Sequence, residues 1–285
     1  MLPRWLKKKI PLGNSDFFTE RTIGDLSLTT VCDHAKCPNR AECYSRNTAT
    51  FMILGEICTR SCGFCNVTSG KPKEVDADEP ERIAIAVQRL GLRYVVLTSV
   101  SRDDLADGGA EHFCNCINSL RSIENPPAIE VLPSDFAGNM DAVDKLSDAM
   151  PNVYNYNVET VPRLFRQVRG AIPTIERTLA IFERIKKRHP KILLKSGMML
   201  GLGETDDEVK ETLQMLHGAG CNAITIGQYL QPNKNKLPVS RYVEPEQFDA
   251  IAETAKQIGF KNIAAAPFVR SSYRAEMMCG IESYI

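Results

Sequence analysis

The sequence predicts an α/β protein built from six β/α units. Short runs rich in Val, Ile, Leu and Tyr alternate with helical patterns along most of the chain. Capping and turn residues stand where these helical patterns begin and end. The length of 285 residues suits a single β/α barrel, a fold that often reaches this size as one domain.

The predicted strands are short apolar segments of similar length. They span residues 49–57, 94–100, 128–134, 152–160, 191–200 and 223–231. Repeated βα units predict a parallel sheet with right-handed crossovers. Six such units close only partly into a barrel, or they form an open doubly wound sheet.

Helical patterns occupy the segments between the strands. The clearest span residues 80–91, 174–189 and 205–220. In the last of these, Thr205 or Asp206 is a suitable N-cap, and Gly218 or Gly220 ends the helix.

The balance of charges argues against nucleic acid and membrane partners. Lys plus Arg number 35 and Asp plus Glu number 35, so no net field attracts a polyanion. The N-terminal residues 1–11 lack the apolar stretch of a signal peptide, and no 18-residue apolar run follows. We therefore expect a cytoplasmic protein. The basic segment RWLKKKI, residues 4–10, could dock an acidic carrier domain or form a solvated arm.

Six of the ten cysteines lie within residues 32–65, in two triplets. The first triplet is Cys32, Cys37 and Cys43, and the second is Cys58, Cys62 and Cys65. In a reducing compartment, clustered cysteines indicate metal ligands or catalysts rather than disulfides. The remaining cysteines, interpreted as ordinary buried thiols, are Cys114, Cys116, Cys221 and Cys279.

Each triplet is one ligand short of a tetrahedral metal site. His34 could complete the first triplet, so a zinc site of Cys32, His34, Cys37 and Cys43 is one alternative. A 4Fe–4S cluster held by three thiolates would instead leave one iron open. The second triplet follows the first predicted strand, at the barrel mouth where active sites are assembled, which favours a functional role.

The segment CTRSCGFC, residues 58–65, resembles the signature of the radical S-adenosylmethionine superfamily. In that superfamily three thiolates hold a 4Fe–4S cluster, and the cofactor's methionine amine and carboxylate chelate the fourth iron. From about Leu6 to Arg274 the chain also resembles the lipoyl synthase family. The motifs that carry this resemblance are the first cysteine triplet, SRDDLADGGAEHF (101–113), VETVPRLF (158–165), KSGMMLGLGET (195–205), QYLQP (228–232) and RSSY (270–273).

The resemblance implies an enzyme that inserts sulfur at C6 and C8 of an octanoyl chain attached to a carrier lysine. These C–H bonds are unactivated, so a radical cofactor must carry the difficult step. The implied cofactors are two 4Fe–4S clusters, one of them the sulfur donor, and S-adenosylmethionine. The implied partners are octanoylated lipoyl domains of 2-oxoacid dehydrogenase E2 or the glycine-cleavage H protein, an electron donor such as ferredoxin or flavodoxin, and an iron–sulfur carrier protein.

The same resemblance implies roles for individual residues. The first triplet would hold the auxiliary cluster, with Ser272 on its fourth iron and Ser271 as the close competitor. The second triplet would hold the cluster that binds S-adenosylmethionine. The superfamily resemblance also makes Gly108 and Gly109 candidate contacts to that cofactor. Polar residues near the predicted barrel mouth are further candidates, namely Asn157, Glu159, Lys195 and Gln228.

Several of these residues also allow structural interpretations. The segment DGG, residues 107–109, could be a turn that starts a helix. Glu159 and Lys195 could form an ion pair, and Gln228 could be structural. Arg270 could contact substrate or cap a helix.

The expected architecture is a partial (β/α)6 TIM-like barrel of the radical S-adenosylmethionine type. We expect an extension with the auxiliary cysteines at residues 1–48, the barrel at 49–259, and a tail with the RSSY motif at 260–285. Two rival functions are considered. One is another sulfur-inserting radical enzyme, such as a methylthiotransferase or biotin synthase, and the other is a zinc-binding module without catalysis.

Overall fold

The computed structural model describes residues 2–7, 16–46 and 48–278. Cys279 and the residues Lys8, Lys9 and Ile10 of the basic segment lie outside this part. The described residues form two compact units. The first unit contains residues 2–7, 61–66 and 153–278, and the second contains residues 16–46, 48–60 and 67–152.

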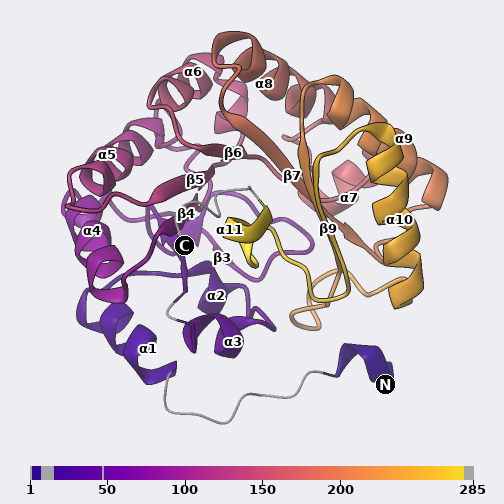
Figure 1. The fold of residues 1–285 in the computed structure, drawn as a ribbon, viewed down its shortest axis with the longest axis horizontal. Helices are drawn as coiled ribbons and strands as arrows, with labels where there is room; N and C mark the ends of the chain where they lie inside the picture. Colours follow the sequence, from indigo (N-terminus) through magenta and orange to yellow (C-terminus); the bar gives the residue numbers. More distant parts are fainter. Residues whose placement is uncertain (1, 8–15, 47, 279–285) are drawn as a thin grey trace. The chain divides into compact units, whose positions relative to one another are not determined.

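The second unit is a three-stranded parallel sheet with helices along its outer side (Figure 1). Its strands lie in the order β1 (Thr50–Ile53), β4 (Tyr94–Ser99) and β5 (Ala128–Leu132). The flanking helices are α4 (Glu79–Leu90), α5 (Ala110–Arg121) and α6 (Met140–Asp148). Ahead of them come α1 (Asp16–Asp25), α2 (Val31–His34) and α3 (Arg40–Tyr44). The short strands β2 (Ile57–Cys58) and β3 (Thr68–Ser69) pair in parallel, and the 3-10 turn η2 covers Phe136–Gly138.

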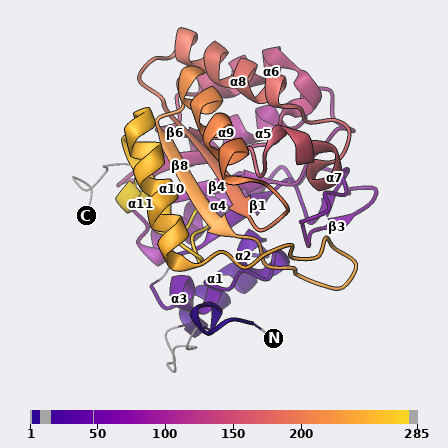
Figure 2. The same ribbon diagram turned by 90° about the vertical axis from the view of Figure 1, so that its right-hand side faces the viewer.

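The first unit is a four-stranded parallel sheet in the order β6 (Val153–Asn155), β7 (Leu193–Leu200), β8 (Ala223–Gln228) and β9 (Asn262–Ala265). Its helical segments are η1 (Arg4–Leu6), η3 (Pro162–Leu164), α7 (Phe165–Arg169), α8 (Ile175–Arg188), α9 (Asp206–Gly218), α10 (Pro245–Ile258) and α11 (Ala275–Met278). Figure 2 shows α9 and α10 side by side along β8. All six residues of β8 are buried, as expected for a parallel strand covered on both faces.

The six predicted strands are all present, and the three clearest helical patterns correspond to α4, α8 and α9. Thr205 is the N-cap of α9, where its side chain and that of Glu208 form a capping box. The expected count of six strands omits β9, which pairs with β8 although its residues fall within the predicted tail. This strand has only four residues, two of them Ala, and all are half-buried, so its sequence gives a weak strand signal. The division into extension, barrel and tail stays a prediction.

No helix in the described residues is long and apolar enough to cross a membrane.

Candidate functional site

The sulfur of Cys58, at the end of β2, receives hydrogen bonds from two backbone N–H groups of the second unit. The N–H of Arg60 lies 3.4 Å and the N–H of Ser101 lies 3.3 Å from Cys58 Sγ. These two donors hold the backbone of Arg60 and Ser101 against the sulfur of Cys58.

Cys62 and Cys65 lie on the segment 61–66 of the first unit, which packs on the C-terminal end of α7. The N–H of Gly63 donates to the Val168 carbonyl at 2.8 Å, and Cys62 Sγ lies 3.5 Å from the carbonyl oxygen of Arg169. This side of the loop is therefore tied to the backbone of α7.

The loop after β8 holds the other side of the same segment. Leu237 N–H donates to the Gly63 carbonyl at 2.9 Å, and Lys236 Nζ donates to the Cys62 carbonyl at 3.1 Å. With α7 on one side and this loop on the other, the segment that carries Cys62 and Cys65 has a defined path.

The first triplet lies ahead of β1, in α2, in α3 and in the segment between these two short helices. Cys32 is buried in α2, and Cys43 belongs to α3. The N–H of Cys37 donates to the Cys32 carbonyl at 3.0 Å. Burial raises the pKa of the Cys32 thiol to about 11, against an opposing hydrogen bond from the backbone of Thr50. Binding to iron must therefore displace a proton from Cys32.

Among the described residues, no three His, Cys, Asp or Glu side chains gather closely enough to hold one metal ion. The arrangement thus gives no support to a zinc site of Cys32, His34, Cys37 and Cys43, which needs ligands around a single ion. A 4Fe–4S cluster places each thiolate on a different iron. The donor set of three thiolates in each triplet fits such a cluster.

Gly108 and Gly109 form the turn that starts α5. Their φ angles are +60° and +93°, values that favour glycine. Asp107 accepts hydrogen bonds from the N–H groups of Gly109 at 2.9 Å and Glu111 at 2.8 Å. These contacts confirm a helix-initiating turn, while the predicted cofactor contact stays a prediction.

Asn157 and Glu159 follow β6 and present two acceptor groups. Asn157 Oδ1 is buried and has no hydrogen-bond partner within the described part of the chain. Glu159 has a φ of +68°, an uncommon conformation that marks functional sites when the surrounding structure enforces it. Burial raises the pKa of the Glu159 carboxyl, and the charge of Arg169, a hydrogen bond with the Asn157 side chain and the charge of Arg270 oppose this rise. Together the two side chains could accept hydrogen bonds from ligand hydroxyl groups.

Lys195 and Gln228 have different surroundings. Lys195 is fully buried in β7. Burial agrees equally with a cofactor contact and with an ion pair. The amide of Gln228 is bound to backbone. Its Nε2 donates to the carbonyls of Leu200, Tyr229 and Arg241, and its Oε1 accepts from the N–H of Val243, at 2.8–3.1 Å. These contacts favour a structural role for Gln228, and we leave it out of the proposed cofactor contacts.

The two serines of the RSSY motif share one turn, residues 271–274. A Cβ added to Gly197 on β7 would lie 2.9 Å from Ser271 Oγ and 2.7 Å from both Asn157 Oδ1 and Thr225 Oγ1. Ser271 therefore faces β7 beside Asn157. Ser271 and Ser272 are both half-buried.

The guanidinium of Arg270 donates to the Val269 carbonyl at 2.6 Å. Val269 lies outside the helices, so this contact does not cap a helix, and a substrate contact of Arg270 stays a prediction.

Three candidate site residues were not predicted from the sequence: Arg169, Arg60 and Asp103. The guanidinium of Arg169 donates to the Asn157 carbonyl at 2.9 Å and to Tyr156 Oη at 2.8 Å, but no motif marks this position. Arg60 and Asp103 form an ion pair. Both lie inside motifs that the sequence displays, and a charged residue between two ligand cysteines could have indicated them.

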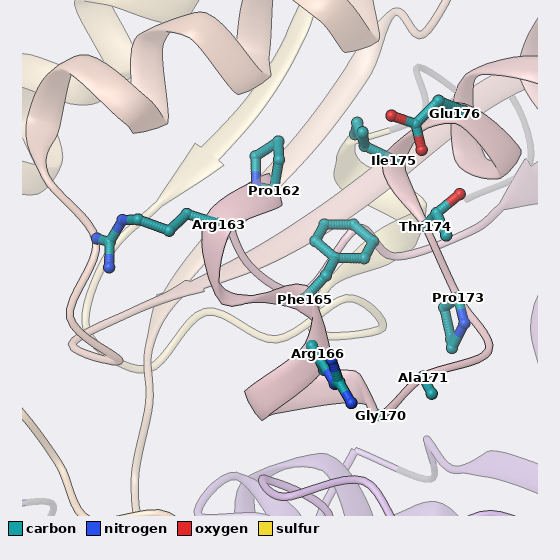
Figure 3. A pocket seen from close by; sticks show the side chains of 10 residues that line it. All are labelled: Pro162, Arg163, Phe165, Arg166, Gly170, Ala171, Pro173, Thr174, Ile175 and Glu176. Carbon is teal, nitrogen blue, oxygen red and sulfur yellow. The ribbon is translucent and has the colours of Figure 1, made fainter.

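A pocket of about 360 Å³ lies in the first unit between η3, α7 and the segment that leads into α8 (Figure 3). Phe165 and Arg166 from α7 face Pro173 and Thr174 across it (Figure 3). None of the predicted site residues lines this pocket.

Comparison with known proteins first identifies the superfamily of this protein. Residues 52–216 match the model of the radical SAM superfamily. A solved methylornithine synthase has the same fold, with a TM-score of 0.58 at 12% identity over 89% of this chain and 72% of that one. The fold and the cysteine loop therefore define a radical SAM protein.

Relatives at higher identity narrow the class. The chain is 51% identical over 282 residues to a lipoyl synthase of Rhodopirellula baltica, covering 99% of this chain and 89% of the relative. It is 50% identical to a lipoyl synthase of Caldicellulosiruptor saccharolyticus, covering 96% of both. The chain belongs to the lipoyl synthase family of radical SAM enzymes, whose cofactors are 4Fe–4S clusters and S-adenosylmethionine.

Proposed function

We propose that this protein inserts two sulfur atoms, at C6 and C8, into a protein-bound octanoyl-lysine and so forms lipoyl-lysine. One observation carries the proposal. Both cysteine triplets stand in ordered segments of a chain that is about half identical to lipoyl synthases along nearly its whole length. A biotin synthase, a methylthiotransferase or a zinc-binding module does not account for this similarity.

We assign the cluster that binds S-adenosylmethionine to Cys58, Cys62 and Cys65. This group, when bound with its cofactor, supplies the radical chemistry that removes hydrogen from C6 and C8. The protein's own part is to hold and orient. Asn157 Oδ1, which has no hydrogen-bond partner among the described residues, is a candidate acceptor for a ribose hydroxyl, and the carboxyl of Glu159, which is hydrogen-bonded to the Asn157 side chain, is a second candidate. The Gly108–Gly109 turn and Lys195 are candidates for the methionine end of the cofactor.

We assign the auxiliary cluster, the sulfur source, to Cys32, Cys37, Cys43 and Ser272. Ser271 Oγ lies against β7 beside Asn157, which leaves Ser272 as the better candidate for the fourth iron. A serine oxygen is a hard ligand on a site made of soft thiolates, so we expect it to be lost easily. Easy loss suits a cluster that gives up its sulfur.

The partners and location follow from the same assignment. The octanoyl chain would arrive on a lipoyl domain of a 2-oxoacid dehydrogenase E2 or on the glycine-cleavage H protein. A ferredoxin or flavodoxin would supply electrons, and an iron–sulfur carrier protein would rebuild the sulfur donor. The thiolate ligands require a reducing compartment, which favours the cytoplasm.

Two triple-alanine variants test the roles of the triplets. Replacement of Cys58, Cys62 and Cys65 should abolish 5′-deoxyadenosine formation and all thiolation of an octanoyl-lysine peptide. Replacement of Cys32, Cys37 and Cys43 should leave 5′-deoxyadenosine formation in place but yield no thiolated peptide. Both products are followed anaerobically by mass spectrometry.

The outcome separates the proposal from its alternatives. Lipoyl product from the second variant would refute the sulfur-donor role of the first triplet. Loss of cofactor cleavage in that variant alone would mean that the two roles are reversed. As a control on cluster content, the reconstituted native chain should bind about eight irons and eight sulfides, and each triple variant about four of each.

A further inference from the structure

An ion-pair network is centred on Arg60 of the second cysteine motif. Arg60, between Cys58 and Cys62 in sequence, forms a forked pair with Asp103. Its Nε lies 2.7 Å from Asp103 Oδ2, and its Nη2 lies 2.6 Å from Asp103 Oδ1. The Arg60 side chain is only 7% exposed. A two-point contact of this kind fixes the direction of the guanidinium as well as its position.

The remaining side of the same guanidinium contacts a second carboxylate. Arg60 Nη1 lies 2.6 Å from Oδ1 of Asp135, whose side chain is completely buried. Asp135 also accepts from the N–H of Ala137 and so holds the turn η2. One arginine therefore joins the cysteine loop to the segments after β4 and after β5.

The segment that carries Asp103 also holds the backbone around Cys58. The N–H of Thr59 donates to the Ser101 carbonyl at 3.0 Å, and Thr59 Oγ1 donates to the same oxygen at 2.9 Å. In return, the N–H of Asp103 donates to Thr59 Oγ1 at 3.1 Å. Residues 58–60 and 101–103 are thus fixed to each other through Thr59.

The two N–H groups directed at Cys58 Sγ come from the residues that this network fixes. One belongs to Arg60 itself, and the other belongs to Ser101, two residues before Asp103. N–H groups that donate to a cluster sulfur stabilise the added electron of the reduced state.

We infer that Arg60, Asp103 and Asp135 are positioning residues that hold these two N–H donors against the Cys58 sulfur and thereby raise the reduction potential of the cluster bound there. This inference rests on the proposed assignment of Cys58, Cys62 and Cys65. It assigns the arginine a geometric role, because its positive charge is already matched by two carboxylates.

Two substitutions separate geometry from charge. Arg60→Lys keeps the charge but cannot form the fork, so a geometric role predicts a lower, more negative potential. Asp103→Asn makes the site more positive. A purely Coulombic role predicts a higher reduction potential for Asp103→Asn and an unchanged reduction potential for Arg60→Lys. The geometric role predicts a lower reduction potential for both variants.

The experiment uses the full chain with Cys32, Cys37 and Cys43 replaced by Ala, reconstituted so that one cluster remains. The midpoint potential is measured by a redox titration followed by EPR, together with iron content, EPR line shape and the melting temperature. Arg82→Lys is the matched control. Arg82 also makes a two-point contact with a carboxylate, that of Asp76, and its Nε donates to the Leu26 carbonyl. This pair is more exposed than Arg60 and Asp103, and Arg82→Lys should change none of the cluster readouts.

We expect Arg60→Lys and Asp103→Asn both to lower the potential, to alter the EPR line shape, and to slow S-adenosylmethionine cleavage by about 10- to 100-fold. An unchanged potential and spectrum in Arg60→Lys, with only a lower melting temperature, would overturn the inference. So would a raised potential in Asp103→Asn. If the background chain binds no four-iron cluster, the assignment of Cys58, Cys62 and Cys65 fails, and with it the basis of the inference.

Discussion

Replacement of Gly63 by alanine should loosen the loop that carries Cys62 and Cys65. An added Cβ would lie 2.9 Å from the Gln167 carbonyl oxygen and 2.9 Å from Leu237 Cδ1. The leucine can rotate away, but the carbonyl belongs to the backbone of α7 and cannot. The φ of Gly63 is not in the left-handed region, so the cost of the substitution is steric.

The magnitude follows from overpacking, which typically costs about 1–3 kcal/mol. For a chain of this size each kcal/mol shifts the melting temperature by about 2–4 °C, so we expect a fall of roughly 2–12 °C. The loop can avoid the carbonyl only by moving off α7. That movement would weaken the 2.8 Å hydrogen bond from Gly63 to Val168 and shift Cys62, so iron retention should fall as well.

The assay is thermal unfolding of the reconstituted chain by circular dichroism, with iron measured after gel filtration. Gly24→Ala is the matched control, because an added Cβ there meets nothing within 4 Å and the position lies within α1. Alanine in a helix should leave stability unchanged or raise it by up to about 1 kcal/mol. A Gly63→Ala variant with native melting temperature and full iron content would refute the steric argument.

Three further predictions concern residues whose roles the sequence left open. Gln228→Ala should lower the free energy of unfolding, measured by urea titration, by at least about 2 kcal/mol, because it leaves buried backbone groups unpaired. A raised KM for S-adenosylmethionine without this loss of stability would show a cofactor contact instead. The raised pKa of Glu159 means that its carboxyl holds a proton more tightly in the native state than in the unfolded state. The stability that this carboxyl contributes is therefore present below its pKa in the unfolded state, and it is lost as pH rises through its pKa in the folded state. Glu159→Gln should therefore gain stability relative to the native chain as pH rises, and parallel melting curves across pH would contradict this. Ser272→Ala should retain cofactor cleavage but form little thiolated peptide, and normal product yield from it, with loss in Ser271→Ala, would move the iron ligand to Ser271.

The sequence alone determined the class of fold and the chemistry. Strand runs and capped helices repeat along the chain, and each signal is local, since a few consecutive residues decide whether a segment is extended or helical. The spacing of Cys58, Cys62 and Cys65 is local in the same sense. The capping of α9 by Thr205 was therefore predictable, and the short, half-buried β9 was not.

Only the tertiary structure decided what the polar residues near these elements contact. Gln228 looks like a site residue in sequence, but its partners come from residues 200, 241 and 243 as well as its neighbour Tyr229. Arg60 looks like a spacer between cysteines, yet its carboxylate partners are Asp103 and Asp135, which follow two other strands. Parallel strands bring such distant residues to one edge of a sheet, and the direction of each side chain there depends on packing between elements, which no local pattern records.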